Sequence, residues 1–378
     1  MRWNETEFMN LYSLPSKNGL TRPSRVRGKG YKMINMGELF ANDRIGNIDM
    51  ELVPMNEREL STMLVERGDL LFARQSLVLS GAGKCSVILS VDEPTTFESH
   101  IIRIRLKKEV ANPFFYHYYF KSPICRIKSI VTQGVQAGIR GNDLKKLRVH
   151  VPPLETQSRI ASILTAYDGL IENNRRRIQL LEQAARLLYK EWFVHLRFPG
   201  HEHVEVVDGV PEGWERKTIG KTAPLRYGKG LKKDDRVPGP FAVYGSSGVV
   251  GSHEKALVIG PAIIVGRKGN VGSVYWSNDD FYPIDTVYYI ESEHSSVYLY
   301  YALLHTQFMS TDVAVPGLNR NYAHSRMLLI PDKKIFALFE GEVSVMRNQI
   351  DLLIKYNGAL SNARDLLLPR LMNGEVAV

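Results

Sequence analysis

The chain has 378 residues, enough for two or three domains that each bury their own core. It contains 49 Lys and Arg residues against 40 Asp and Glu residues, which gives a formal net charge of +9 at pH 7. The sequence has no apolar run of the roughly 18 residues that a membrane span needs, and its first residues, MRWNETEFMN, lack the zones of a signal peptide, so we expect a cytoplasmic protein.

Residues 1–153 are predicted to form a mainly β domain, because period-two stretches such as HIIRIRL at 100–106 are separated by Gly, Pro, Asn and Asp. This region holds 23 Lys and Arg against 15 Asp and Glu, a difference of +8. Such an excess suits a polyanionic partner such as nucleic acid, although it can also serve solubility alone. Cys85 and Cys125 lack further ligands at zinc-site spacing, so we expect buried free thiols.

Residues 154–193 are predicted to form one long helix that begins after a proline stop. Its apolar side chains follow a heptad seam, in which alternate steps of four and three residues reach each member and Asn174 is the single polar one. The seam consists of Ile160, Leu164, Tyr167, Ile171, Asn174, Ile178, Leu181, Ala185, Leu188 and Trp192. The segments ENNRRR (172–177) and EQAAR (182–186) supply the exposed surfaces that we regard as candidates for contact with a partner protein.

Residues 194–332 are predicted to contain a Pro/Gly-rich linker, at 197–215, and a second mainly β domain. This domain repeats the first, because GPAIIVGRKG corresponds to GDLLFARQS and the aromatic run VYLYY corresponds to FFYHYYF. We interpret both aromatic runs as core rather than as base-stacking surfaces, because their spacing is helical. The region holds 14 Lys and Arg against 15 Asp and Glu, a difference of −1.

Residues 333–378 are predicted to form a second long helix. Adding 179 to each seam position of the first helix gives Phe339, Val343, Met346, Ile350, Leu353, Asn357, Leu360, Arg364, Leu367 and Leu371. The chain is therefore predicted to be an internal duplication, in which each copy is a globular domain followed by a long helix. The predicted fold class is α+β, with two mainly β domains and a pair of long antiparallel coiled-coil helices.

If the two copies are related by a pseudo-twofold axis, the helices run antiparallel. The residue numbers of the two members of each seam pair must then add up to the same value. A sum of 531 places Asn174 opposite Asn357, where a buried amide pair would fix the register of the two helices. The same sum pairs Trp192 with Phe339. It also places Arg364 opposite Tyr167, where we expect the guanidinium to stack on the ring.

Loops in both copies carry the residue types that read bases, which are Arg or Lys for guanine and Asn or Gln for adenine. The candidates in the first copy are Arg74, Gln75, Gln133, Gln136, Arg140 and Asn142. Those in the second copy are Arg267, Lys268, Asn270, Asn319, Arg320, Asn321 and Tyr322. Two basic stretches are candidates for phosphate contacts through Arg22, Arg25, Arg27, Lys29, Lys32, Lys229, Lys232 and Lys233. Each of these segments could also be an ordinary solvated loop.

Five phrases in chain order resemble the specificity (S) subunits of type I DNA restriction-modification systems. They are GDLLFAR, VPPLETQSRIASIL, LLYKEWF followed by RFP, GVPEGWE and LLLPRLMNGEV. The second copy departs from the pattern, since IPDKKIFALFEGEV lacks the PPLETQ wording and IIVGRKG replaces LLFARQS. The resemblance implies target recognition domains at 1–153 and, after the linker, within 194–332, with spacer helices at 154–193 and 333–378.

The resemblance also implies a non-catalytic chain that binds double-stranded DNA at a bipartite target and docks two DNA methyltransferase (M) subunits together with restriction (R) subunits. S-adenosylmethionine and ATP are then expected on the partner subunits only, and this chain is expected to hold neither cofactor nor metal. Two alternatives remain open: a stand-alone enzyme that modifies or cleaves DNA, and a coiled-coil scaffold that does not bind DNA. The enzyme needs clustered carboxylates or a cofactor loop, which the sequence does not show clearly, and the duplicated basic loops count against the scaffold.

Overall fold

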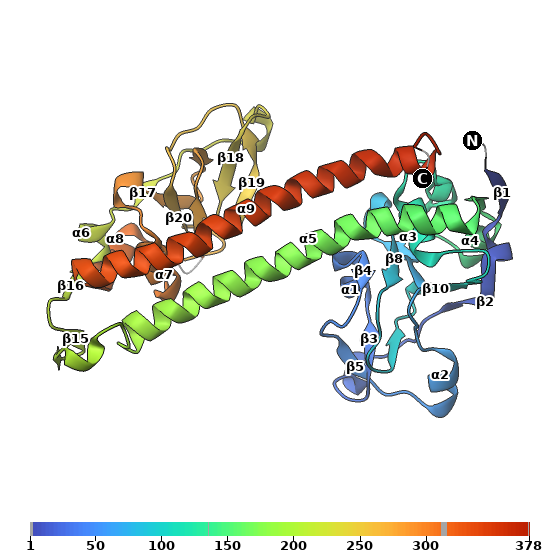
Figure 1. The fold of residues 1–378 in the computed structure, drawn as a ribbon, viewed down its shortest axis with the longest axis horizontal. Helices are drawn as coiled ribbons and strands as arrows, with labels where there is room; N and C mark the ends of the chain where they lie inside the picture. The colour runs from blue at the N-terminus through green and yellow to red at the C-terminus, as the bar shows by residue number, and fades with distance from the viewer. Residues whose placement is uncertain (1–2, 135, 311–315, 377) are drawn as a thin grey trace. The chain divides into compact units, whose positions relative to one another are not determined.

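The computed structural model describes residues 3–134, 136–310, 316–376 and 378, and the chain divides into two compact units. Unit 1 comprises residues 1–173 and 356–378, and unit 2 comprises residues 174–355. Each unit contains one globular region and parts of the same two long helices, α5 (Leu154–Tyr189) and α9 (Lys333–Met372) (Figure 1). The combination of sheets and helices in both units confirms the predicted α+β class.

Unit 1 is built on a five-stranded sheet, with three smaller sheets beside it. The five-stranded sheet has the order β2 (Tyr12–Asn18), β10 (Ile101–Leu106), β6 (Leu70–Ala73), β8 (Cys85–Ile88) and β4 (Arg44–Ile45). The smaller sheets are β5 (Glu51–Val53), β3 (Tyr31–Ile34) and β9 (Thr95–Phe97); β11 (Thr132–Gln133), β12 (Ala137–Gly138) and β7 (Gln75–Ser76); and β1 (Asn4–Glu7) with β13 (Arg148–Val151). The short helices are α1 (Met36–Ala41), α2 (Glu57–Thr62), α3 (Pro113–Lys121) and α4 (Gly141–Lys146).

The aromatic run of the first copy forms α3, and it lies in the main core of unit 1. Asn112 caps the helix, because its side-chain oxygen accepts hydrogen bonds from the N–H groups of Phe114 and Phe115. Tyr116 and Tyr118 are fully or almost fully buried among the apolar residues of the sheet. The interpretation of this run as core is therefore confirmed, and the buried ring of Tyr116 has no face left for stacking on a base.

The two cysteines belong to the same core. Cys85 and Cys125 are both buried and both unbonded, which confirms the prediction of buried free thiols. Burial raises the pKa of the Cys125 thiol to about 12, so it stays protonated and unreactive at neutral pH.

Unit 2 has a four-stranded sheet in the place of the five-stranded one. Its order is β17 (Arg226–Tyr227), β23 (Val287–Ile290), β20 (Ala262–Gly266) and β21 (Val274–Ser277). The other sheets are β19 (Gly248–His253), β18 (Phe241–Gly245) and β22 (Phe281–Pro283); β16 (Glu215–Thr218) with β24 (Met327–Ile330); and β14 (Val206–Val207) with β15 (Val210–Pro211). The short helices are α6 (Ile219–Thr222), α7 (Val297–His305) and α8 (Arg320–Ser325), and a π-helical turn, Lys190–Val194, follows α5.

The duplication that the sequence predicts is visible in strand pairing. In unit 1, β6 pairs antiparallel with β8 and with β10, and in unit 2, β20 pairs in the same way with β21 and β23. The loop that joins the first two strands has eleven residues in unit 1 (74–84) and seven in unit 2 (267–273). The copies therefore share a strand framework, and they differ in the loop that leaves it.

The helix seam holds in each unit as predicted. In unit 1, Ile160 and Leu164 of α5 share a buried cluster with Leu371 of α9. In unit 2, the rings of Trp192 and Phe339 lie 5.8 Å apart between centroids, and they match one predicted layer. The helices are thus antiparallel neighbours within each unit.

The predicted layer of Asn174 and Asn357 spans the division between the units, because Asn174 belongs to unit 2 and Asn357 to unit 1. Both residues make interactions, so neither is without a partner. The pairing of these two amides stays a prediction, as does the division of the chain into the four predicted segments.

Phe339→Ala is expected to destabilise unit 2 by about 3–5 kcal/mol, because a fully buried ring is removed from a packed core. The ring lies within 4.9 to 6.4 Å, between centroids, of five aromatic neighbours: Tyr189, Trp192, Phe193, Tyr298 and Tyr301. The neighbouring Leu338 is 43% exposed, and Leu338→Ala serves as the matched control with a change of about 0.5 kcal/mol or less. Urea unfolding of both variants measures the difference, and equal losses would contradict the seam.

Candidate nucleic-acid interface

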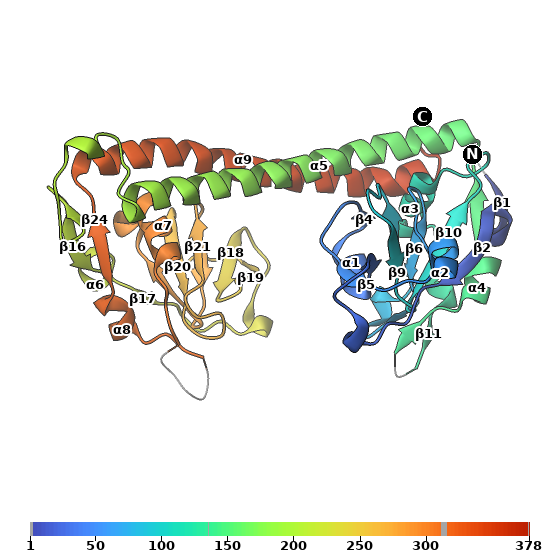
Figure 2. The same ribbon diagram turned by 90° about the horizontal axis from the view of Figure 1, so that it is seen from below.

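In unit 1 the predicted reading loops meet at one small sheet. β7 pairs with β12, and β12 pairs with β11, so the segment at 74–76 lies beside these two strands. Gln133 and Gln136 are exposed, and Gln75 is half-buried on the neighbouring strand. Figure 2 shows β11 at the end of unit 1 that lies away from α5. Three amide side chains therefore border one accessible surface.

The backbone of Arg74 anchors this surface to the main sheet. Its N–H donates a hydrogen bond of 2.8 Å to the carbonyl of His100, and its carbonyl accepts one of 2.9 Å from the N–H of Ile139. Arg140 follows at the N-cap position of α4, and Asn142 lies in the first turn of that helix. The structure thus brings the two predicted segments of the first copy, 74–75 and 133–142, together.

The basic stretch of unit 1 divides into paired and unpaired cations. Arg22 forms an ion pair of 2.6 Å with Glu59, Arg27 forms one of 2.5 Å with Glu51, and the ammonium of Lys32 lies 3.3 Å from Glu93. The remaining two candidates of this stretch are exposed and have no ion pair with any described residue: Arg25 and Lys29. The exposed pair can take a phosphate directly, whereas the other three must exchange a carboxylate for it.

In unit 2 the predicted reading loops also meet. The N–H of Leu318 donates a hydrogen bond of 2.8 Å to the carbonyl of Arg267, and Lys268 forms a β-bridge with Gly317. This anchor repeats that of unit 1, where Ile139 donates to Arg74, at an offset of 179 residues between the donors. Asn270 is exposed on the same loop, where its amide donates to the hydroxyl of Ser247 at 3.3 Å.

The second segment of unit 2 begins α8. The side chain of Asn319 accepts hydrogen bonds from the N–H groups of Asn321 and Tyr322, so it serves as the helix cap. Arg320 and the exposed Asn321 follow in the first turn, and Tyr322 is half-buried. Sequence reasoning placed all four residues in one group of base readers, whereas the geometry shows that the oxygen of Asn319 is already used within the chain.

The basic stretch of unit 2 follows β17 directly. Lys229, Lys232 and Lys233 are exposed, and none of them forms an ion pair with another residue of the described chain. The backbone N–H of Lys229 donates to the carbonyl of Pro283 at 3.0 Å, which fixes the start of this segment on the sheet. Unpaired lysines on a fixed backbone are suited to phosphate contacts.

Sequence reasoning missed two features of these surfaces. Tyr227 lies beneath the guanidinium groups of Arg267 and Arg320, although only the charges of its stretch, RYGKGLKK, drew attention. In unit 1, the loop 74–84 exposes the consecutive apolar side chains of Leu77, Val78 and Leu79. The sequence does show this triplet as three apolar residues between two serines. Periodicity alone, however, could not distinguish an exposed apolar loop from a short strand.

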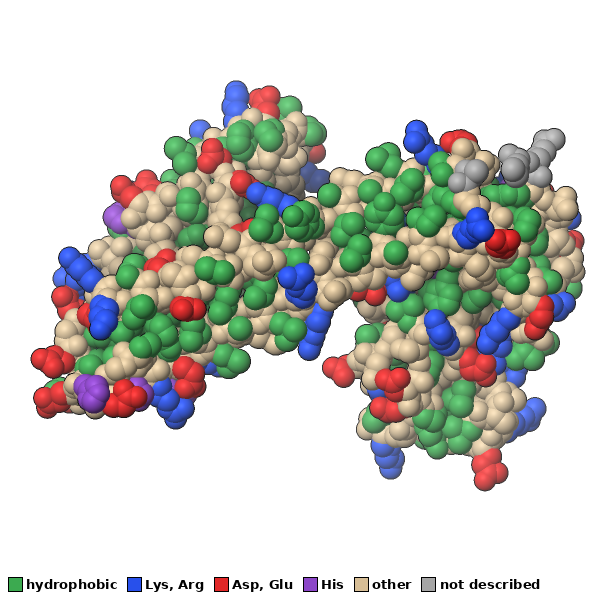
Figure 3. Space-filling view, viewed as in Figure 1, with side chains coloured by type: hydrophobic (Ala, Val, Ile, Leu, Met, Phe, Trp, Pro, Cys, Tyr) green, Lys and Arg blue, Asp and Glu red, His purple; other side chains and the backbone are tan. Residues whose placement is uncertain are grey.

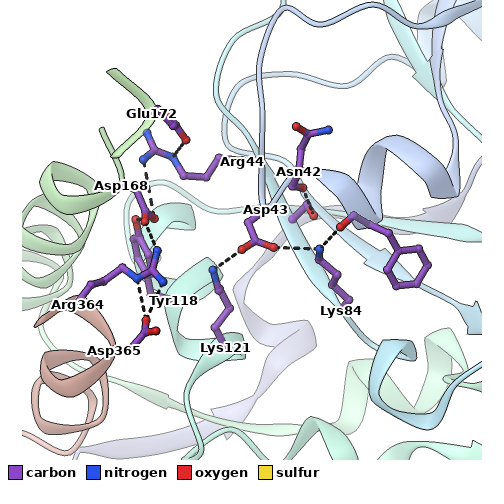
Figure 4. A network of polar contacts seen from close by, with 12 residues as sticks. Asn42, Asp43, Arg44, Lys84, Tyr118, Lys121, Asp168, Glu172, Arg364 and Asp365 are labelled. Carbon is purple, nitrogen blue, oxygen red and sulfur yellow. Dashed lines mark hydrogen bonds and ion pairs between the residues drawn. The ribbon is translucent and has the colours of Figure 1, made fainter. Parts of the chain in front are cut away.

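Asp168 of α5 is the centre of a polar joint that ties the globular region of unit 1 to both helices (Figure 4). Its carboxylate accepts a hydrogen bond of 2.6 Å from the hydroxyl of Tyr118 on α3 and one of 2.5 Å from Arg364 on α9. Arg44, on the edge strand β4 of the five-stranded sheet, lies 3.9 Å from the same carboxylate. Three elements that are distant in sequence therefore meet at one charge.

This joint corrects one sequence prediction. Arg364 does not take the ring of Tyr167 as its main partner, because its guanidinium forms ion pairs with Asp168 and with Asp365, at 2.5 and 2.8 Å. A carboxylate binds a guanidinium more strongly than a ring face does. Since Asp168 directly follows Tyr167, the corrected partner changes the chemistry of the layer but not the register of the helices.

The charge of Asp168 is stabilised by its partners. Burial by itself raises the pKa of a carboxyl group, but the hydrogen bonds from Tyr118 and Arg364 outweigh burial and hold the pKa of Asp168 below its ordinary value of 3.8. Asp43 nearby binds Lys121 at 2.7 Å and Lys84 at 3.0 Å. These lysines likewise hold the pKa of Asp43 low against the effect of burial. Both carboxylates are therefore ionised at neutral pH.

Neither a metal centre nor a membrane-spanning helix is seen among the described residues. Within residues 3–134, 136–310, 316–376 and 378, no three His, Cys, Asp or Glu side chains gather in a way that could hold a metal ion. Over the same residues, no helix combines the length and apolar character needed to cross a bilayer.

Comparison with known proteins gives a consistent group of relatives. A family model described as "Type I restriction modification DNA specificity domain" matches residues 14–183. The chain is 23% identical over 370 residues to the type I restriction enzyme MjaIX specificity subunit of Methanocaldococcus jannaschii, covering 88% of this chain and 85% of that protein. It is 29% identical over 163 residues to the type I restriction enzyme EcoKI specificity subunit of Escherichia coli K12, covering 41% of this chain and 35% of that protein.

Among solved structures, the chain is similar to the crystal structure of a type I restriction-modification system S subunit from M. genitalium. The TM-score is 0.64 at 17% sequence identity, and the match covers 98% of this chain and 96% of that one. The likeness shows a common fold along nearly the whole of both chains.

Asp168→Asn is expected to destabilise unit 1 by about 2 kcal/mol at pH 7, because Arg364 and Tyr118 lose a charged acceptor. The lowered pKa of Asp168 means that its contribution is present above pH 3.8 and is lost as the pH falls through the folded-state pKa. The gap between variant and wild type should therefore shrink below pH 3.8 in urea unfolding. The control is Asp365→Asn, which removes an exposed carboxylate from the same arginine and should cost about 0.5 kcal/mol or less. A gap that is independent of pH would contradict the assignment.

Proposed function

We infer the function of this chain from the family to which it belongs, the specificity subunits of type I restriction-modification systems. We propose that it binds double-stranded DNA and recognises a target of two parts, one with each globular region. The observation that carries this proposal is the repeated anchor at Arg74 and Arg267. In both copies it presents an arginine and neighbouring amide side chains on a loop that leaves the sheet, which is the chemistry needed to read base edges.

The exposed cations support the same function. Unit 1 offers Arg25 and Lys29, and unit 2 offers Lys229, Lys232 and Lys233, all without carboxylate partners among the described residues. Such side chains contact phosphates, and these contacts strengthen binding without selecting a sequence. We propose that these residues position the DNA and that the anchored loops specify its sequence.

The alternatives have less support. A stand-alone DNA-modifying or DNA-cleaving enzyme is disfavoured because the relatives are named as specificity subunits, and this component of the enzyme is the non-catalytic one. A scaffold that does not bind DNA leaves the repeated arginine and amide loops without a role. We therefore propose that the chain holds no cofactor and that S-adenosylmethionine and ATP are bound by its partner subunits, in the cytoplasm.

The partners that we propose are two DNA methyltransferase subunits, together with restriction subunits, and the helices supply a surface for them. In unit 2, apolar side chains are exposed at every seventh residue of α9, at Leu338, Val345 and Leu352. Leu180 and Leu187 follow the same spacing on α5. Figure 3 shows apolar side chains over both helices on the face in view. Apolar side chains at this spacing favour packing against a helix of a partner protein over exposure to solvent.

A reconstitution experiment tests the proposed function. The full chain, a cognate methyltransferase subunit and genomic DNA are incubated with labelled S-adenosylmethionine. We expect methylation of a split motif only when both proteins are present, because recognition and chemistry lie on different chains. Methylation by this chain alone would establish the enzyme, and full methylation by the partner alone would remove the need for a specificity subunit.

Val345→Asp is expected to weaken binding of the methyltransferase subunit by about 10-fold or more, because a charge would be buried in an apolar contact. Val207→Asp is the matched control: Val207 is 59% exposed on β14 rather than on a helix, so the same substitution there should change binding by about twofold or less. Titration calorimetry of the full chain with the partner measures both affinities. Equal affinities for Val345→Asp and the wild type would exclude this row of α9 as the docking surface.

A further inference from the structure

One aromatic ring in unit 2 contacts two arginine side chains from other segments. Tyr227 ends β17 and is 47% exposed. The guanidinium carbon of Arg267, in the loop after β20, lies 4.9 Å from the centroid of this ring, and that of Arg320, at the start of α8, lies 4.8 Å from it. Both distances are typical of cation–π contacts, so the ring fixes the place of both cations.

Backbone hydrogen bonds also fix the position of Arg267, in addition to its contact with the ring. Its N–H donates to the carbonyl of Thr286 at 2.9 Å, and its carbonyl accepts from the N–H of Leu318 at 2.8 Å. One end of its guanidinium donates to the carbonyl of Asp285 at 3.0 Å. The guanidinium also contacts Tyr288, at 5.8 Å from the centroid of that ring, so part of the planar fork is held within the chain and part is available to a ligand.

The ring of Tyr227 has a firm base. It pairs across the sheet with Tyr288, and the two rings lie 5.1 Å apart between centroids. The buried hydroxyl of Tyr288 donates to the carbonyl of Leu318 at 2.8 Å, which ties the sheet to the segment that leads into Arg320. The three side chains of the cluster are thus organised before any ligand binds, so little ordering is required on binding.

The charge of this cluster lacks a counterpart in the described chain. Neither Arg267 nor Arg320 forms an ion pair with a described residue, whereas Arg22 and Arg27 of unit 1 each hold a glutamate. Two cations beside one ring repel each other, and the face of the ring offsets this repulsion only in part. The cluster is therefore suited to a ligand that offers several hydrogen-bond acceptors.

We propose that Arg267 and Arg320 read guanine in the half of the DNA target that unit 2 recognises, and that Tyr227 is the positioning residue for both. The proposal rests on the proposed function and makes it specific. Guanine presents two acceptors, O6 and N7, on its major-groove edge, and a guanidinium with a fixed plane matches them. The neighbouring lysines, Lys229, Lys232 and Lys233, carry free charges without a fixed plane and are suited to the phosphates.

The described residues of unit 1 do not form this cluster, although unit 1 keeps the framework. Asn18 pairs with Ile102 on β10, in the place where Tyr227 pairs with Tyr288 on β23. Arg74 has the same backbone anchor as Arg267, but no ring contact is found for it among the described residues. The preorganised guanine reader is therefore assigned to unit 2 alone.

The experiment uses the full chain in complex with its methyltransferase subunit, with the methylated motif read by long-read sequencing of DNA. The wild type should methylate a motif with at least one guanine in one half. In the Arg267→Gln and Arg320→Gln variants, the guanine position of that half should accept other bases or a different base. The other half of the motif should be unchanged. Tyr227→Phe, which keeps the ring, should retain the motif, and Tyr227→Ala should relax it. Arg216→Gln, an exposed arginine of the same unit away from the cluster, should leave the motif intact.

A second measurement uses the wild-type complex and so does not depend on how a variant folds. Replacing the assigned guanine by 7-deazaguanine removes the N7 acceptor, and we expect DNA binding to weaken by about 5-fold or more. The same replacement in complexes of the Arg→Gln variant that relaxes the motif should have almost no further effect.

Three results would overturn the proposal. The first is a motif without guanine in either half. The second is an unchanged motif in both arginine variants with uniformly weaker binding and a salt dependence lowered by about one charge, since this is the behaviour of a phosphate contact. The third is wild-type binding that is insensitive to 7-deazaguanine. Failure of the wild-type complex to bind or methylate any split motif would instead overturn the proposed function, and this inference would fall with it.

Discussion

Packing between α5 and α9 is the interaction on which both units depend. Ile160 and Leu164 of α5 join Leu371 of α9 in the core of unit 1, and Ala185 joins Phe339 in the core of unit 2. Neither globular region closes its core without side chains from both helices. The helices are therefore structural parts of the two globular regions and not only connections between them.

The helices and their pairing could be predicted because a heptad seam is a local property of the sequence. Steps of four and three residues located the seam, and the offset of 179 gave the layer of Trp192 with Phe339. The partner of Arg364 could not be predicted in this way. Asp168 lies one position off the seam, and its selection depends on Tyr118 and Arg44, which arrive from the globular region through tertiary folding. Periodicity finds a helix face, but it does not find a charge that another element brings to it.

The same distinction applies to the candidate interface. Composition identified the loops, because arginine and amide residues next to glycine are visible in the sequence, and the structure brings the segments of each copy together. It could not identify which members are already occupied: Asn319 caps a helix, and Arg22 and Arg27 hold glutamates. Nor could it identify Tyr227, whose contact with two arginines depends on strand pairing across the sheet.

The duplication explains how one framework can carry two different loops. The hydrogen bonds from Ile139 to Arg74 and from Leu318 to Arg267 join backbone atoms, so they are insensitive to the side chains that the loops carry. Loop length and the residue on the neighbouring strand are then free to differ, and they do: unit 1 has an eleven-residue loop beside Asn18, and unit 2 a seven-residue loop beside Tyr227. Because backbone atoms fix the position of each loop and side chains supply its chemistry, the loop of one unit can differ from that of the other without a change in the framework.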